Sequence, residues 1–336
     1  MTFKQAMAIY VTDMRAEGRI TSDRSEATYW RTLELHAEDV GNRDPRTTGR
    51  EDIKRTLRRW SNPSTQRTRR AVLVSFYDWA MEEGYRKDNP ARQTRRPRAK
   101  PADVFRLTRQ EAQAMLATAN TGRVKERRAV HIGLLAGLRR QELIGLQGLH
   151  FERDGWIWVS GEIAKGGRER WVPVLPDLEP VVNDIRSTVA RAHFVLPAQK
   201  QTAGGFGANY VDVPEKPMGA VTLYRMVGQV GARAGVSGGV TVHALRRAFA
   251  EHVARESGLR VAQALLGHAD VGTTRGYTDA PTLDELRDAV RGTSFTDRPA
   301  EGLPPSEPAG KRSSGDGGNR TREKGAPFDG PAGIER

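Results

Sequence analysis

The sequence contains no cysteine, and this absence excludes disulfide bonds, cysteine-ligated zinc and cysteine nucleophiles. It also contains no apolar run near the ~18–20 residues that a membrane-spanning helix needs. The first residues are typical of an amphipathic helix rather than a signal peptide, because no basic start precedes an uninterrupted apolar core. We therefore expect a protein of the cytoplasm that has no membrane partner.

A nucleotide-binding loop is also missing. The glycine-rich stretch at residues 203–209 is not followed by the Gly-Lys-Ser/Thr of a phosphate-binding loop, so we expect an ordinary loop there. The sequence shows no internal repeat of the kind that indicates a solenoid or a propeller.

Acidic residues are outnumbered by basic ones, 41 against 54, which gives a formal net charge of +13 and a pI of about 10.3. Such a balance favours a polyanionic partner, of which nucleic acid is the commonest, over a cationic surface without a special role. A chain of 336 residues is long enough for about two domains.

Residues 1–90 are expected to be helical, because apolar residues recur there at helical spacing in four segments. Seven Lys or Arg and no acid occur between Lys54 and Arg70, among side chains that can donate hydrogen bonds to phosphate. A small helical module with one basic face is typical of a DNA clamp. The alternative is a solvated charged face.

A basic, proline-containing segment follows the helical module. Between Arg86 and Arg109 there are nine basic residues, two acids and three prolines, a composition that keeps a chain extended. The segment could track a DNA backbone or serve as an ordinary hinge, and both can be true. The candidate DNA-binding residues of the module and this segment are Lys54, Arg55, Arg58, Arg59, Arg67, Arg69, Arg70, Arg95, Arg96, Arg98 and Lys100.

A second domain is expected to begin near residue 107, where Thr108 and Glu111 form a capping box for a helix. Alternating residues at 155–175 predict a β-hairpin with Lys165, Gly166 and Gly167 at its tip. From residue 293 the chain is rich in Gly, Pro, Ser and charge, and we expect this tail to be disordered. Further helices are predicted at 125–135, from 139, and at 177–192, 219–235, 242–256, 259–266 and 283–291.

Five short segments of the second domain are weak signals one by one but specific in combination. In chain order they resemble the tyrosine recombinase (phage integrase) family, whose pattern is G-L-R-x-x-E-L, a hairpin lysine, H-x-L-R, G-H and a tyrosine nine residues after that histidine. Here His268 and Tyr277 have this spacing. The segments are Gly137–Leu143, the hairpin tip around Lys165, His243–Arg246, Leu266–His268 and Thr273–Tyr277.

The resemblance implies a role for each matching residue. Arg139 and Arg246 match the arginines that grip the scissile phosphate, and Tyr277 matches the nucleophile. Glu142 matches an acid that supports the active site. Lys165, His243 and His268 match the remaining catalytic positions. Ala136 and Arg247 depart from the common pattern, which has Thr or Ser and His there, and neither change removes a catalytic group.

The same resemblance implies the architecture. We expect a mainly α-helical chain with a small antiparallel β-sheet: a helical, SAM-like core-binding domain followed by an α+β catalytic domain. The expected boundaries are residues 1–90 for the core-binding domain, 91–106 for the basic linker, 107–292 for the catalytic domain and 293–336 for the tail. Residues 282–292, which follow Tyr277, are expected to dock on a neighbouring protomer; the alternative is a helix packed on its own domain.

The residue types suit strand cleavage without a metal ion or cofactor. Two guanidiniums can stabilise the charge on the non-bridging oxygens of a phosphorane, which is the work of Mg²⁺ in a metal nuclease. A phenol needs its proton removed or its anion stabilised, and a nearby histidine or the arginine pair could do either. Lys165 on a glycine-rich hairpin is a reasonable acid for the departing 5′-oxygen.

The expected function is site-specific DNA recombination through a 3′-phosphotyrosyl intermediate, which integrates or excises a phage or mobile element. A chromosome-dimer resolvase or transposon recombinase is the alternative within the family. Two alternatives have a different function: a non-catalytic DNA-binding protein on the same scaffold and a type IB topoisomerase. The resemblance implies double-stranded DNA, a homotetramer on that DNA, a DNA-bending host factor and a directionality factor as partners.

Overall fold

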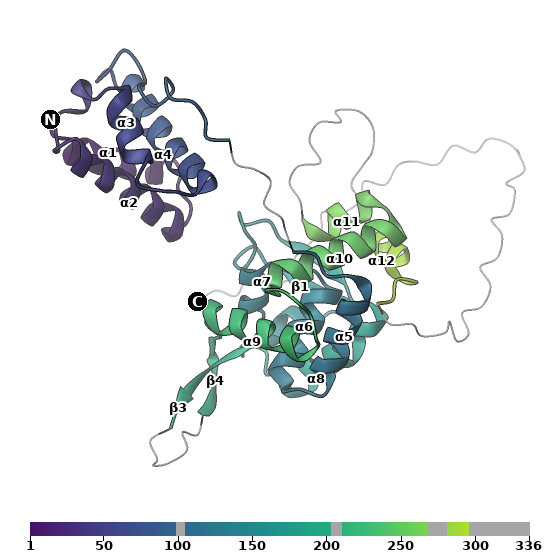
Figure 1. The fold of residues 1–336 in the computed structure, drawn as a ribbon. Coiled ribbons are helices and arrows are strands. Elements are labelled where there is room, and N and C mark those ends of the chain that lie inside the picture. Colours follow the sequence, from purple (N-terminus) through teal and green to yellow (C-terminus); the bar gives the residue numbers. More distant parts are fainter. Residues whose placement is uncertain (99–104, 203–209, 268–280, 296–336) are drawn as a thin grey trace, which may run out of the picture. The chain divides into compact units, whose positions relative to one another are not determined.

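The computed structural model describes residues 1–98, 105–202, 210–267 and 281–295 (Figure 1). The buried apolar side chains in these ranges form two separate clusters, one between Phe3 and Ala91 and the other between Leu107 and Phe295. Across the described ranges, no helix combines the length and the apolar character needed to span a bilayer.

The first cluster is enclosed by four helices, as the sequence predicts (Figure 1). Residues such as Phe3 and Phe76 pack their rings together in its centre. The hydroxyl of Ser22 and the amide oxygen of Asn62 accept backbone hydrogen bonds at two of the helix starts, which explains where those helices begin. The helices are α1 (Phe3–Ala16), α2 (Asp23–Asp39), α3 (Arg50–Leu57) and α4 (Pro63–Glu82), with a short 3₁₀ turn at Pro45–Thr47.

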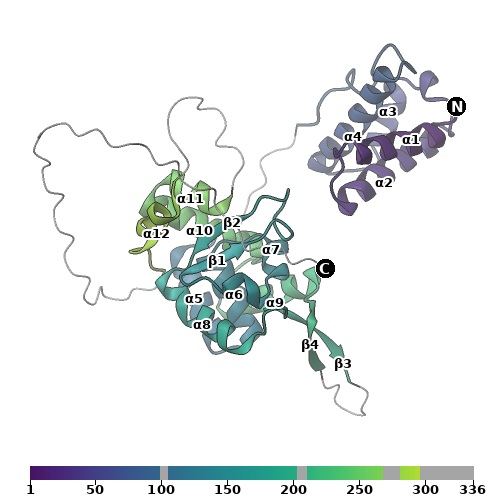
Figure 2. The ribbon, with the colours of Figure 1, turned by 180° about the vertical axis from the view of Figure 1, so that it is seen from behind.

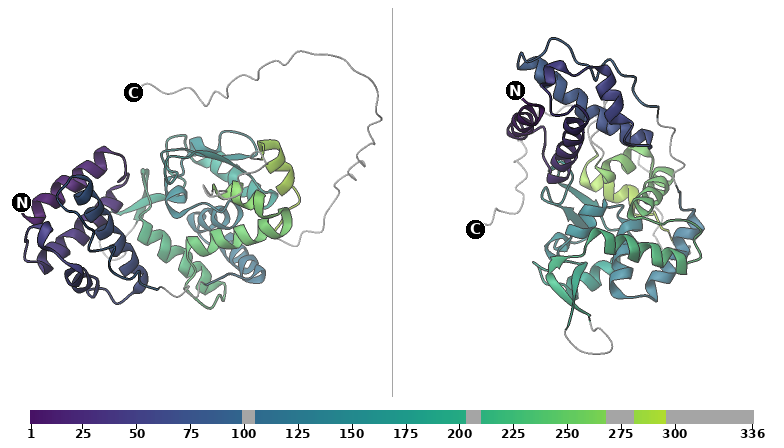
Figure 3. Two further views of the ribbon diagram at one scale, coloured as in Figure 1. Left: turned by 90° about the horizontal axis from the view of Figure 1, so that it is seen from above. Right: turned by 60° about the vertical axis from the view of Figure 1, so that its left-hand side comes forward.

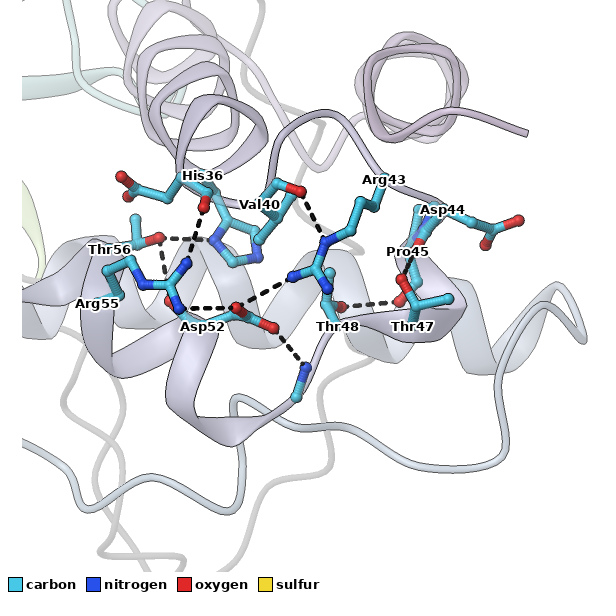
Figure 4. Close-up of polar contacts among 12 residues, drawn as sticks. His36, Val40, Arg43, Asp44, Pro45, Thr47, Thr48, Asp52, Arg55 and Thr56 are labelled. Atoms are coloured by element: carbon cyan, nitrogen blue, oxygen red, sulfur yellow. Dashed lines mark hydrogen bonds and ion pairs between the residues drawn. The ribbon is translucent and has the colours of Figure 1, made fainter.

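A buried histidine connects these helices through polar contacts (Figure 4). His36 of α2 lies 2.7 Å from the Thr56 hydroxyl through Nδ1 and 2.8 Å from the Tyr77 hydroxyl through Nε2. The Tyr77 hydroxyl is also 2.6 Å from the hydroxyl of Thr48. Burial lowers the pKa of His36 to about 4, so the ring is neutral at physiological pH.

The packed chain continues past residue 90. Ala91 is fully buried in the first cluster. Arg70 of α4 donates to the hydroxyl of Thr94 at 2.9 Å and to its carbonyl oxygen at 2.8 Å. The linker expected from residue 91 therefore needs correction, because these contacts fix the chain to α4 at least as far as Thr94.

The second cluster is built around α6, which contacts α5, α7, α8, α9 and α10. Every residue from Arg128 to Leu135 is buried, as expected for a helix surrounded by others. The capping box predicted at Thr108 and Glu111 is present. The helices of this part are α5 (Arg109–Asn120), α6 (Val124–Leu135), α7 (Arg140–Gly145), α8 (Glu179–Thr188), α9 (Ala220–Arg233), α10 (Val242–Ser257), α11 (Leu259–Leu266) and α12 (Leu283–Val290), with 3₁₀ turns at Gly148–Phe151 and Pro176–Leu178.

Two antiparallel hairpins accompany the helices. The predicted hairpin is present as β1 (Trp156–Val159) and β2 (Arg170–Pro173), with Trp158 opposite Trp171. A second hairpin, β3 (Pro197–Gln201) and β4 (Tyr210–Pro217), was not predicted. It extends away from the helices (Figures 1 and 2), and the segment 203–209 lies outside the described residues.

Helices α10, α11 and α12 pack against one another (Figure 3). Leu286 and Val290 of α12 are buried in the second cluster, and the Arg287 guanidinium lies 5.2 Å from the Trp156 ring centroid. The described structure therefore follows the alternative, a helix whose Leu286 and Val290 pack on their own domain, and docking on a neighbouring protomer stays a prediction.

The end of the packed chain also differs from the expectation. Phe295 is buried, and its ring centroid lies 3.9 Å from that of His252. Its backbone N–H donates to Asp177 at 2.8 Å. The predicted start of the tail at residue 293 is therefore too early, because the buried Phe295 ring holds residues 293–295 against the domain. Residues 296–336 lie outside the described part.

Candidate active site

Arg139 lies at the start of α7, directly after a sharp turn. Gly137 makes this turn with a φ of +61°, and a Cβ there would overlap the ring of Phe249, so the position requires glycine. The Arg139 backbone N–H donates to Oε2 of Glu142 at 2.7 Å, and its Nη1 donates to Oε1 at 2.8 Å. The Arg139 side chain keeps 28% of its surface exposed, which leaves its guanidinium accessible.

Arg246 and His243 are three residues apart on α10 and so share one face of that helix. The Arg246 side chain is only 7% exposed. Its Nη1 donates to the carbonyl oxygen of Gly137 at 2.6 Å, and its Nη2 donates to that of Leu266 at 2.7 Å. These two bonds fix the guanidinium beside the turn that carries Arg139.

The electrostatics of the two α10 residues differ. Burial, together with the positive charge of Arg139, lowers the pKa of Arg246 to about 10, so this guanidinium remains charged at neutral pH. Burial and the charges of Arg247 and Arg246 lower the pKa of His243 below its usual value of 6.5. A neutral imidazole at this position can accept a proton.

Lys165 lies at the exposed tip of the segment between β1 and β2. Gly166 and Gly167 have φ angles of +79° and +70°, and the N–H of Gly167 donates to the carbonyl oxygen of Ala164 at 3.1 Å. The tight turn needs glycine at both positions, because the left-handed region is unfavourable for other residues. It presents the lysine ammonium at the end of a short hairpin.

These residues surround a single cavity of about 710 Å³. The structure therefore brings together four of the predicted catalytic residues and the supporting acid, although they come from three separate stretches of the sequence. His268 and Tyr277 lie outside the described residues. The lining residues are Leu138, Arg139, Arg140, Gln141, Glu142, Ile163, Lys165, Tyr224, Thr241, Val242, His243 and Arg246.

One arginine near this cavity was missed by the sequence analysis. Arg170 donates to both carboxylate oxygens of Glu142, at 3.0 and 2.8 Å. Burial by itself would raise the pKa of Glu142, but the hydrogen bonds from Arg170 and Arg139 outweigh it and lower the pKa to about 2. The signal for Arg170 was an arginine two residues before the buried Val172, on the inward face of a strand.

The candidate DNA-binding residues fall into two groups. Arg69 donates to the carbonyl oxygen of Thr28 at 2.9 Å, and Arg70 contacts Thr94, so both hold the helical module together. Lys54, Arg55 and Arg59 also contact acidic side chains or a backbone carbonyl. Lys100 lies outside the described residues. Arg58, Arg67, Arg95, Arg96 and Arg98 are exposed, as are Arg55 and Arg59 despite their contacts.

Comparison with known proteins identifies the family. Residues 106–282 match the family model described as the phage integrase family. Tyrosine recombinase XerC of Salmonella typhi is 31% identical over 248 residues, which cover 70% of this chain and 76% of that protein. Tyrosine recombinase XerD of Caulobacter vibrioides is 33% identical over 228 residues, which cover 65% of this chain and 71% of that protein.

The fold is shared with solved structures. A lambda integrase (75–356) dimer bound to a COC′ core site has a TM-score of 0.64 at 17% identity, and the match covers 84% of this chain and all of that one. The Tn1549 transposon integrase in complex with a circular intermediate DNA has a TM-score of 0.61 at 20% identity, covering 86% of this chain and 98% of that one.

The chain belongs to the phage integrase family and is a site-specific DNA recombinase of the tyrosine type. The predicted family and enzyme class are confirmed. The predicted fold class, mainly helical with little antiparallel strand, is confirmed as well, with two small hairpins in place of one sheet.

Proposed function

We propose that this recombinase cuts and rejoins DNA through a 3′-phosphotyrosyl bond on Tyr277, and that it integrates or excises a phage or mobile element. The observation that carries the proposal is the cavity that Arg139, Lys165, His243 and Arg246 line together. These side chains supply both the charge and the proton transfers that attack on a phosphodiester requires.

The two guanidiniums hold the scissile phosphate. Arg246 is fixed by two backbone carbonyls, and Arg139 is fixed by Glu142, so neither group has to reorganise when charge develops on the non-bridging oxygens. Arg246 stays charged at neutral pH despite its burial, and the two guanidiniums act together on the phosphate. They perform the electrostatic work for which other nucleases use a metal ion, and we propose that the reaction needs neither metal nor cofactor.

Proton transfer is divided among the other groups. The Tyr277 oxygen attacks phosphorus, the bond from phosphorus to the 5′-oxygen breaks, and Lys165 gives a proton to that oxygen. In this scheme His243 and His268 assist removal of the phenol proton. A 5′-hydroxyl from a second DNA then attacks the phosphotyrosine and releases Tyr277, which joins the strands.

We further propose that residues up to Thr94 form a core-binding module which holds DNA with the exposed Arg58 and Arg67, and that the segment through Arg95, Arg96 and Arg98 follows the phosphate backbone. Two duplexes need four active sites, so the working form is a homotetramer. A crystal structure shows a lambda integrase tetramer bound to a Holliday junction, which supports this assembly. A DNA-bending host factor and a directionality factor complete the proposed partners.

The similarity to XerC and XerD favours a second candidate, a resolvase that exchanges two copies of one site. An integrase instead joins two different sites and leaves two hybrid ones. Sequencing the joints formed by the purified protein on plasmids that carry the element's end sequences distinguishes the two: hybrid joints support integration, and unchanged sites support resolution.

The covalent step can be tested with a nicked DNA that carries the core site and loses a short fragment after cleavage, so that the protein stays attached. With EDTA present, wild type and Tyr224→Phe should form the adduct and Tyr277→Phe should not. Tyr224 is the informative control because its phenol lines the same cavity. Loss of the adduct in Tyr224→Phe but not in Tyr277→Phe would contradict the proposal.

A further inference from the structure

Arg170 contacts two parts of the active site at once. It is the first residue of β2, five positions after Lys165, and its side chain is only 10% exposed. Nη1 and Nη2 each donate to one oxygen of Glu142, at 3.0 and 2.8 Å. Nε donates to the carbonyl oxygen of Leu265 at 3.0 Å. All three nitrogens of this guanidinium therefore donate hydrogen bonds inside the protein.

These bonds determine what Glu142 can do. Oε1 accepts from Arg139 and Arg170, and Oε2 accepts from the Arg139 backbone and Arg170, all within 3.0 Å. The carboxylate, which is 1% exposed, has no freedom to turn towards Arg246, whose Nη1 stays 3.9 Å away. Glu142 consequently holds Arg139 in one orientation without binding a second catalytic arginine closely.

The charge balance also indicates that Arg170 keeps Glu142 away from Arg246. Three guanidiniums, those of Arg139, Arg170 and Arg246, share one carboxylate. If Arg170 were absent, Glu142 would neutralise a larger part of the charge that Arg139 and Arg246 present to a phosphate. Arg170 occupies the carboxylate and leaves that charge for the developing phosphorane.

The end of α11 is held by the same group of arginines. The carbonyl oxygens of Leu265, Leu266 and Gly267 accept, in that order, from Arg170, Arg246 and Arg139. Gly267 ends the helix with a φ of +61°, and a Cβ there would come within 2.9 Å of the Arg170 Cδ. Arg170 therefore also fixes the base of the Lys165 hairpin to the end of α11.

We propose that Arg170 is a positioning residue for strand cleavage: it locks Glu142, and through Glu142 it orients Arg139 towards the scissile phosphate. This inference rests on the proposed function, because it takes the cavity as the phosphate site. Lysine cannot replace Arg170, since a single ammonium cannot reach two carboxylate oxygens and a carbonyl in the fixed geometry of the fork.

The test is single-turnover cleavage of the nicked substrate by Arg170→Lys, with Arg128→Lys as matched control. Arg128 is 9% exposed and also contacts a carboxylate and a carbonyl, those of Asp184 and Val195, but it does not line the cavity. Arg170→Lys should lower the cleavage rate constant by about 10- to 100-fold with nearly unchanged Kd for DNA. The control should lose thermal stability to a similar extent and cleave at nearly the wild-type rate.

A double-mutant cycle decides whether Arg170 acts through Glu142. In the Glu142→Gln background, the further change Arg170→Lys should slow cleavage little, because the group that Arg170 positions is already altered. Independent, multiplying effects overturn the inference, as does wild-type cleavage by Arg170→Lys. If wild type itself forms no adduct, the proposed function fails first and removes the inference with it, so the two failures are distinguishable.

Discussion

The Nη1 of Arg246 donates to the carbonyl oxygen of Gly137 at 2.6 Å. This bond joins two motifs that lie 109 positions apart in the sequence, and it places the buried guanidinium beside the turn that presents Arg139. Arg139 and Arg246, the proposed catalytic arginines, therefore form a single assembled unit in the described structure.

Replacement of Arg246 by lysine should slow adduct formation by about 100- to 1,000-fold, the usual cost of losing a preorganised donor to a developing anion. The single nitrogen of a lysine cannot reach both carbonyls and the phosphate, because two separate Nη atoms of Arg246 bond the carbonyls. Arg247→Lys is the matched control, because Arg247 is adjacent, donates to the carbonyl oxygen of Phe105 at 3.1 Å and does not line the cavity. Single-turnover cleavage rates measure both, and equal losses in the two variants would count against the assigned role.

The assignment of Lys165 as general acid predicts rescue by a better leaving group. Lys165→Ala should slow cleavage of ordinary DNA by about 100- to 10,000-fold. A substrate with sulfur in place of the bridging 5′-oxygen should be cleaved by wild type and variant at similar rates, because a thiolate departs without a proton. An equal defect on both substrates would mean that Lys165 does not donate the proton.

The buried His36 predicts an acid-sensitive helical module. Its pKa of about 4 lies below the ordinary 6.5, so the unfolded chain binds the proton more readily. Its contribution is complete above pH 6.5 and is lost as the pH falls towards 4, with a loss of about 2 kcal/mol at pH 5.

Urea unfolding of wild type and His36→Gln, near neutral pH and at about pH 5, measures this loss. Glutamine can hydrogen-bond but does not titrate in this range. Wild type should lose more free energy of unfolding on acidification than the variant, and the difference isolates His36 from the other histidines. Parallel losses in the two proteins would show that His36 is not the titrating group.

Phe295 should stabilise the catalytic domain although it lies in a segment expected to be disordered. Its ring is buried against His252, so Phe295→Ala should lower the free energy of unfolding by about 3–5 kcal/mol. Phe295→Leu keeps most of the apolar volume and should cost less. Denaturant midpoints for the three proteins test this, and unchanged midpoints would mean that the chain end does not pack in solution.

Much of the site could be predicted from sequence because its signals are local. The pattern around Arg139 and Glu142 fixes a helix start, and the spacing of His243 and Arg246 fixes a helix face. The two glycines beside Lys165 indicate the turn that presents it. The local backbone conformation that places each of these side chains depends on neighbours within a few positions, where sequence patterns are informative.

What could not be predicted depends on distant partners. The β3–β4 hairpin buries little of its surface, so its sequence lacks the alternation that marks a half-buried strand. The role of Arg170 becomes visible only when Glu142 and Leu265 are placed beside it. The packing of α12 and Phe295 likewise depends on surfaces supplied by β2 and α10.

The most direct test of the central claim is to identify the amino acid that carries the DNA. Trypsin releases residues 276–287 from the covalent adduct as a peptide with one tyrosine, Tyr277. After nuclease trimming, mass spectrometry should find a nucleotide 3′-phosphate on that tyrosine in wild type and no modified peptide in Tyr277→Phe. A nucleotide on any other residue, Tyr224 included, would contradict the account.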